Sequence, residues 1–145
     1  MQTIFSVDRV LGGKSKLKSR PKTPYDWHDL LEGGLPLNAL ENFKQATAMS
    51  DTQLAGLIGI SHKTLQRARG NRKRLDAVTS DRLFRTATIV ALAGQVLEDG
   101  ERGIAWLGRS QMGLGGKVPF ALMTTEAGCD QVEKLLLRIE HGVYA

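Results

Sequence analysis

The chain has 145 residues, of which 41% are hydrophobic and 24% are charged, and its formal net charge is +5. This length accommodates one domain or two small ones, and the apolar fraction is sufficient for a buried core. No run approaches the roughly 18 apolar residues of a membrane span, and the first residues lack the pattern of a secretory signal. We therefore expect a cytoplasmic protein without a membrane partner.

Charge is distributed unevenly along the chain. Residues 1–80 hold 13 Lys and Arg against 7 Asp and Glu, a net of +6, whereas residues 81–145 hold 7 against 8, a net of −1. The first part suits a polyanion and the second does not. The single cysteine, Cys129, cannot form an internal disulfide, and its place on an apolar helical stripe predicts a core residue.

Residues 1–24 show the weakest structural pattern, because glycines and prolines surround alternating cations. We expect a flexible basic arm, which could contact phosphates or equally be a solvated tail. Residues 25–74 form the next predicted domain. Helices are expected over 25–31 and 37–47, since apolar residues recur there at helical spacing.

Residues 51–74 carry the most informative pattern, a helix, a tight turn and a second helix that continues into a basic tail. Gly59 occupies the turn, where a residue without Cβ is inexpensive, and Ser61 is a suitable N-cap for the second helix. The apolar positions that would pack the two helices together are Leu54, Ala55, Leu57, Ile58, Ile60, Leu65 and Ala68. This is the layout of a helix-turn-helix, in which the second helix reads DNA.

The exposed face of that second helix carries the donors used in major-groove recognition. Lys and Arg can donate to guanine and Gln can pair with adenine, while the cations of the tail would contact phosphates. The predicted DNA-binding residues are Ser61, His62, Lys63, Gln66, Arg67, Arg69, Arg72 and Arg74. The alternative is a plain helical hairpin with a solvated basic face.

Residues 75–145 are predicted to form a second, helical domain. A long helix over 81–98, capped by Thr79 or Ser80, is apolar around most of its circumference and is our candidate dimer interface. Shorter helices follow over 101–107 and from Pro119, and the last spans 126–141. No strand alternation of useful length appears, so the fold class is all-α with seven or eight helices.

The sequence offers no convincing catalytic or cofactor site. The glycine-rich run 113–119 lacks the glycine and the hydroxyl residue that a Walker loop requires, so it is interpreted as a turn leading into the helix at Pro119. His28, His62 and His141 are far apart and lack partners at metal-ligand spacing. We expect no enzyme activity, no metal and no cofactor.

The second domain resembles the toxin-binding domain of Xre/MbcA/ParS-type antitoxins. The resemblance is carried by SDRLFRTATIVALAGQVLED at 80–99, by LGGKVPFALM at 114–123 and by the closing RIEHGVY at 138–144, with ISHKTLQRARG at 60–70 upstream. Relatives commonly have an Asn-Pro segment ahead of the LGG turn, where this chain has Ser110 to Met112.

The resemblance implies an antitoxin that represses its own operon through the helix-turn-helix and neutralises a partner toxin through the second domain. The usual partner is a RES-domain toxin that consumes NAD, and the C-terminal end of the antitoxin blocks the toxin's active site. The implied toxin-binding residues are Arg138, Glu140, His141, Gly142, Val143 and Tyr144.

Other functions fit parts of the same pattern. The chain could be a stand-alone transcription regulator whose second domain only dimerises or senses a ligand. It could also be an enzyme or an interaction module in which the helix-turn-helix is vestigial. A homodimer on operator DNA is expected for the antitoxin and for the stand-alone regulator, because DNA-binding proteins of this type pair their half-sites by two-fold symmetry.

Overall fold

The computed structural model describes residues 7–71 and 74–142. These residues form ten α-helices and one 3₁₀ helix, and they contain no strand beyond an isolated bridge between Gln111 and Lys117. The all-α fold class is therefore confirmed. None of the described helices is long and apolar enough to cross a membrane.

The described residues divide into two compact units, 7–87 and 88–142. The first contains α1 (Val7–Val10), α2 (Gly13–Leu17), α3 (Pro24–Gly33), α4 (Leu37–Thr47), α5 (Asp51–Ile58), α6 (His62–Asn71) and the first part of α7 (Ala77–Val96). The second contains the remainder of α7, then α8 (Gly100–Leu107), the 3₁₀ helix η2 (Met112–Leu114), α9 (Pro119–Leu122) and α10 (Glu126–Glu140).

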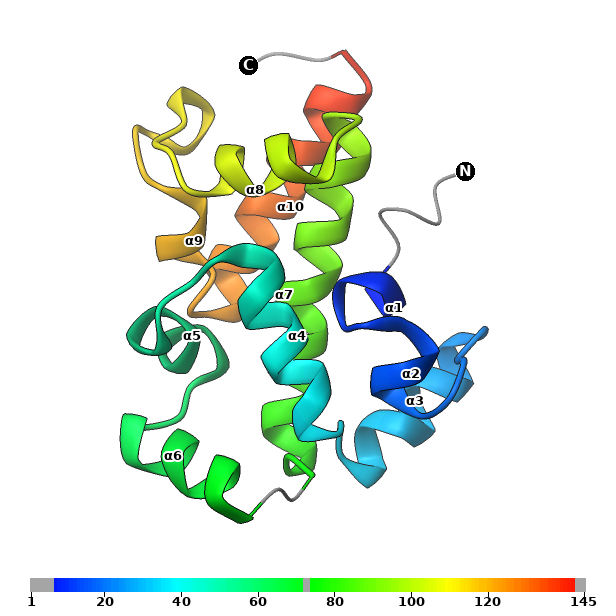
Figure 1. Ribbon diagram of the computed structural model, residues 1–145. Coiled ribbons are helices and arrows are strands. Elements are labelled where there is room, and N and C mark those ends of the chain that lie inside the picture. Colours follow the sequence, from blue (N-terminus) through cyan, green and yellow to red (C-terminus); the bar gives the residue numbers. More distant parts are fainter. Residues whose placement is uncertain (1–6, 72–73, 143–145) are drawn as a thin grey trace. The chain divides into compact units, whose positions relative to one another are not determined.

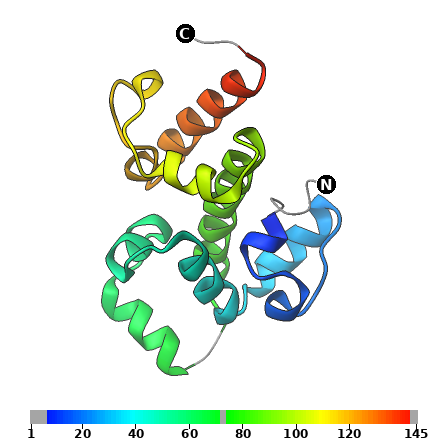
Figure 2. The ribbon, with the colours of Figure 1, turned by 45° about the horizontal axis from the view of Figure 1, so that its top comes forward.

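The first unit is built around α4, with α5 on one side and α1 to α3 on the other (Figures 1 and 2). Its core is mostly apolar, with a few buried Thr and Ser side chains. The half-buried rings of Trp27 in α3 and Phe84 in α7 lie against each other with centroids 4.7 Å apart. Side chains with no exposed surface in this core include Leu40, Phe43, Leu54, Ile58, Leu65 and Leu83.

The N-terminal segment corrects one prediction. Residues 7–17, expected to belong to a flexible arm, form α1 and α2, and Leu11 and Leu17 are buried. The segment folds because two leucines six residues apart enter the core. The lysines between them hide this pattern when the sequence is searched for helical periodicity. The seven or eight predicted helices omitted these two.

The start of α7 corrects a second prediction. Its N-terminal turn is capped by Asp76, whose carboxylate accepts a hydrogen bond from the backbone N–H of Thr79 at 2.7 Å. Thr79 and Ser80 lie inside the helix instead, and the buried hydroxyl of Ser80 accepts the N–H of Leu35 at 2.8 Å. The first part of α7 thus belongs to the first unit, and the chain passes from one compact unit to the other after residue 87.

The second unit gathers around the apolar stripe of α10, which includes Cys129, Val132 and Leu136. The thiol of Cys129 lies 3.4 Å from the carbonyl oxygen of Met123, to which it donates, so its predicted core position is confirmed. Pro119 begins α9 as expected. The apolar positions of α7 in this unit, among them Ile89, Val90 and Ala93, are buried within the chain itself.

Candidate nucleic-acid and protein interfaces

The turn between α5 and α6 forms as the sequence predicts. Ser50 caps α5 through a reciprocal pair of bonds with Gln53, and Gly59 ends the helix in the left-handed region at φ 72°. A Cβ on Gly59 would meet the guanidinium of Arg82, whose Nη1 lies 3.4 Å from the Gly59 carbonyl oxygen. Glycine is favoured there for its backbone conformation, because the flexible end of the Arg82 side chain could move aside for a Cβ.

The second helix begins at the predicted cap. The Ser61 hydroxyl accepts the N–H of Thr64 at 3.0 Å and lies 2.8 Å from the Thr64 hydroxyl. Leu65 is buried under the helix, whereas the predicted base readers Lys63, Gln66 and Arg67 are exposed. Within residues 7–71 and 74–142, Lys63 and Arg67 have no acidic partner, so both cations are available to a ligand.

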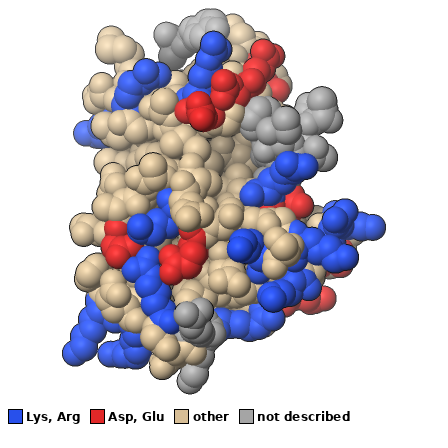
Figure 3. Space-filling view, in the orientation of Figure 1, with Lys and Arg blue, Asp and Glu red and all other residues tan. Residues whose placement is uncertain are grey.

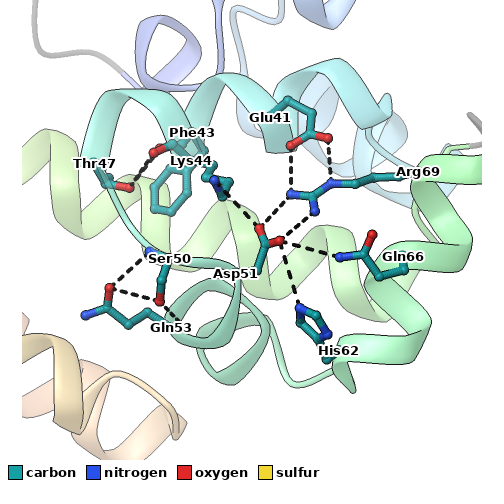
Figure 4. Close-up of polar contacts among 10 residues, drawn as sticks. All are labelled: Glu41, Phe43, Lys44, Thr47, Ser50, Asp51, Gln53, His62, Gln66 and Arg69. Atoms are coloured by element: carbon teal, nitrogen blue, oxygen red, sulfur yellow. Dashed lines mark hydrogen bonds and ion pairs between the residues drawn. The ribbon is translucent and has the colours of Figure 1, made fainter.

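Arg69 does not extend the basic tail as predicted. Its guanidinium donates to the two oxygens of Glu41 at 2.8 and 3.1 Å, and to the two oxygens of Asp51 at 2.8 Å each (Figure 4). Such bidentate contacts are the strongest that Arg makes, because its planar fork matches a carboxylate. The side chain is 23% exposed and is committed to two acids, so we correct its assignment from a phosphate contact to a link joining α6 with α4 and α5.

Asp51 is the centre of this cluster. The hydrogen bonds from Arg69, opposed by desolvation and assisted by the charges of Arg69, Lys44 and His62, lower the pKa of Asp51 from 3.8 to about 2. The same carboxylate lies 3.7 Å from Lys44 Nζ, 3.9 Å from His62 Nε2 and 3.5 Å from Gln66 Nε2. One carboxylate on α5 therefore holds the start, the middle and the end of α6.

The remaining residues of the predicted DNA set have different places. Arg74 donates to the carbonyl oxygen of Gly34 at 2.8 Å, and the next residue, Leu75, donates its N–H to Leu35. Arg74 therefore fastens the chain after α6 to the segment before α4. Arg72 lies outside the described residues.

The predicted toxin-binding residues lie at the end of α10. Arg138 is in the last turn with its Nε atom buried and without a hydrogen-bond partner among the described residues. Glu140 is the last residue of α10 and His141 is its C-cap. Gly142 follows in the left-handed region at φ 73°, which ends the helical course of the backbone. These last three are exposed, while Val143 and Tyr144 lie outside the described residues.

Sequence reasoning missed one exposed apolar residue in the second unit. Met112 is 92% exposed, yet the loop that presents it is tightly bonded, since Gln111 exchanges backbone hydrogen bonds with Lys117 and Gly116. The loop also lies on α10, because a Cβ on Gly113 would approach Leu135 to 2.7 Å. Methionine is enriched at protein interfaces relative to other surface, so Met112 is a candidate contact residue. The sequence signal that could have indicated this loop is the group of glycines that follows Met112.

The geometry of the first unit defines a DNA-binding protein of the helix-turn-helix class. Residues 26–87 match the antitoxin Xre-like helix-turn-helix domain, and residues 92–142 match the antitoxin Xre/MbcA/ParS C-terminal toxin-binding domain. The chain therefore carries both domains of Xre-type antitoxins, in this order, over most of its length.

Three relatives are each named Antitoxin Xre. One from Pseudomonas putida is 40% identical over 63 residues, which are 43% of this chain and 40% of the relative's length. One from Yersinia enterocolitica is 26% identical over 81% of this chain and 80% of the relative. One from Photorhabdus laumondii is 25% identical over 79% of this chain and 78% of the relative.

Proposed function

We propose that this chain neutralises a RES-domain, NAD-consuming toxin by direct binding and represses its own operon through the helix-turn-helix. The observation that carries the proposal is that the two candidate surfaces belong to different compact units. Exposed, unpaired cations on α6 suit DNA, whereas the ordered loop at Met112 and the end of α10 suit a protein.

The DNA-reading surface is centred on Lys63, Gln66 and Arg67, with Ser61 and His62 at the helix N-terminus, where backbone N–H groups favour a phosphate. Arg72 and Arg74, which follow α6 in the sequence, are proposed as further phosphate contacts. We propose that the chain binds its operator as a homodimer, because one recognition helix spans few base pairs. The apolar positions of α7 that were expected to form the dimer contact are largely buried in their own chain, which leaves few of them for such a contact.

The toxin-binding surface combines Arg138, Glu140, His141, Gly142, Val143 and Tyr144 with Met112. The loop that carries Met112 packs against α10, because Gly113 lies close to the side chain of Leu135. A protein that contacts α10 would therefore lie near this loop as well. The segment after α10 would enter the toxin's cleft, and Met112 would anchor beside it. Chemistry on NAD belongs to the toxin, so this chain needs no cofactor.

Two sets of variants test the division. In cells that express the toxin, deletion of residues 142–145 or Met112→Ala should reduce rescue of growth, while operator binding in a gel shift is kept. Lys63→Ala with Arg67→Ala should abolish operator binding and keep rescue. Loss of both activities in a folded variant of either set would contradict separate surfaces.

A further inference from the structure

The segment before the helix-turn-helix domain is strongly cationic. Between Asp8 and Asp26 the chain carries six Lys and Arg residues and no acidic residue. This segment precedes residues 26–87, which match the antitoxin helix-turn-helix domain. The cations of this segment therefore lie outside the matched helix-turn-helix domain and need a role of their own.

The segment is a fixed part of the first unit. Leu11 and Leu17 are 0% and 1% exposed, and both α1 and α2 contact α4. The side chain of Asn42 on α4 donates to the carbonyl oxygen of Val10 at 3.1 Å. The backbone that carries the lysines of α2 is thus held in place, which lowers the entropy cost of binding a ligand.

Four cations of this segment point outward and are uncompensated. We name them the N-terminal basic surface: Lys14, Lys16, Lys18 and Arg20. None of the four makes an ion pair with any residue of the described ranges. Lys22 is set apart from them, because the carboxylate of Asp26 accepts its backbone N–H and carries a compensating charge nearby.

Backbone geometry helps to gather these cations. Gly12 adopts φ 101°, and its lack of a Cβ lets the aliphatic stem of Lys16 lie directly over it. Lys18 ends α2 in the left-handed region at φ 65° and donates its N–H to the Lys14 carbonyl at 2.8 Å. The three lysines therefore project from one short turn, where their positive potentials add together and attract an anion.

The four named cations carry one sign of charge, whereas a solubilising surface normally mixes both. In Figure 3, blue side chains of the first unit run from the side of α6 to the side of α2 and α3, with red acidic side chains among them. In both ribbon views α2 lies across α4 from α5, so its cations are removed from the reading helix.

We propose that the N-terminal basic surface binds the phosphate backbone of double-stranded DNA outside the base pairs that α6 reads. This inference rests on the proposed DNA binding by α6 and extends it. The surface would add affinity and widen the footprint without adding sequence preference, because phosphate contacts carry no base information.

The test compares two variants of equal net charge. Lys14→Gln/Lys16→Gln/Lys18→Gln removes three cations from this surface, and Arg102→Gln/Arg109→Gln/Lys117→Gln removes three exposed cations from the second unit. The probe is a long duplex from upstream of the gene that encodes the chain, and a second duplex is trimmed to the base pairs protected by α6. Dissociation constants are measured over a range of NaCl concentrations.

On the long duplex, the first variant should reduce the slope of log Kd against log salt by about 2 to 3, since each phosphate contact contributes about 0.9. The control variant should leave the slope unchanged. On the trimmed duplex the first variant should bind like the wild-type protein. Phosphate interference mapping should lose signal only at the flanks.

Equal slopes for wild-type protein and the first variant would overturn the inference, as would an equal loss on both duplexes or the same loss in the control variant. If the first variant binds DNA normally but weakens the complex with the toxin, the surface serves a protein and the inference is wrong. Lys63→Ala with Arg67→Ala separates the two proposals: if it leaves sequence discrimination intact, the failure lies in the proposed function of α6.

Discussion

At the scale of single residues, Arg69 shows how a side chain of the expected type can have an unexpected role. Its place after Arg67 on a basic helix predicted a phosphate contact. The two acids that engage it are 28 and 18 residues away in sequence, so no local pattern could reveal them. The sequence gives the number of Lys and Arg residues in this unit, but it does not show which of them form ion pairs with acidic residues.

Arg69→Gln should lower the free energy of unfolding of the first unit by about 1 to 2 kcal/mol. The substitution removes charge-assisted hydrogen bonds that are only partly exposed to solvent, and it leaves Glu41 and Asp51 facing each other. Urea denaturation followed by circular dichroism measures the loss. The matched control, Lys134→Gln, breaks an exposed pair with Asp130 in the second unit and should cost less than about 0.5 kcal/mol.

Acid should weaken the same cluster in a defined range of pH. The folded pKa of Asp51 is about 2 and its ordinary value is 3.8, so the carboxylate stabilises the fold fully above about pH 4. That contribution is lost as the pH falls from 4 through 2. Asp51→Asn should therefore be less stable than wild type at pH 7, and the difference should shrink steadily toward pH 2. A constant difference over this range would contradict the assigned role.

At the scale of elements, most helices follow from sequence. The caps at Thr23, Ser50, Ser61, Asp99 and Thr125 are all short polar residues that accept a hydrogen bond from the first turn of a helix. The exceptions are α1 and α2, which are too short to show a period, and the beginning of α7, where three candidate caps occur close together. In the second unit, sequence could not show that Gly94 of α7 and Gly103 of α8 meet.

Gly103→Ala should destabilise the second unit by about 1 to 3 kcal/mol, because the new Cβ would lie 2.6 Å from the backbone nitrogen of Gly94. Backbone atoms cannot move aside as a flexible side chain can. Gly56→Ala is the control, since this exposed glycine in α5 has nothing within 4 Å of its would-be Cβ. That change should stabilise the protein by about 0.5 to 1 kcal/mol in a thermal melt.

At the scale of the whole molecule, the division of charge is the property that sequence predicted best. The residues that carry it lie in two units, each with a core of its own. What sequence could not supply was the division within α7, because a continuous helix gives no compositional signal at residue 87. It also could not supply Met112, whose exposure depends on how the loop closes.

The charge division predicts that the two complexes differ in their sensitivity to salt. Raising NaCl from about 50 to 200 mM should weaken DNA binding at least about tenfold, because counterions compete for the phosphates. The complex with the toxin should change far less, since its proposed contacts are largely apolar or made with an interface of low net charge. Fluorescence anisotropy with labelled DNA and labelled toxin measures both. A steep salt dependence of both complexes would contradict the division.

The ion pairs that Arg69 makes with Glu41 and Asp51 also restrict the order in which these residues can be substituted during evolution. Loss of the arginine first would leave two neighbouring carboxylates unneutralised beside a DNA-reading helix, which harms folding and repels phosphate together. Loss of Glu41 first leaves Arg69 with one acid and a smaller penalty. Descendants of this sequence should therefore reach an uncharged version of the link by giving up Glu41 before Arg69, and the reverse order should be rare among them.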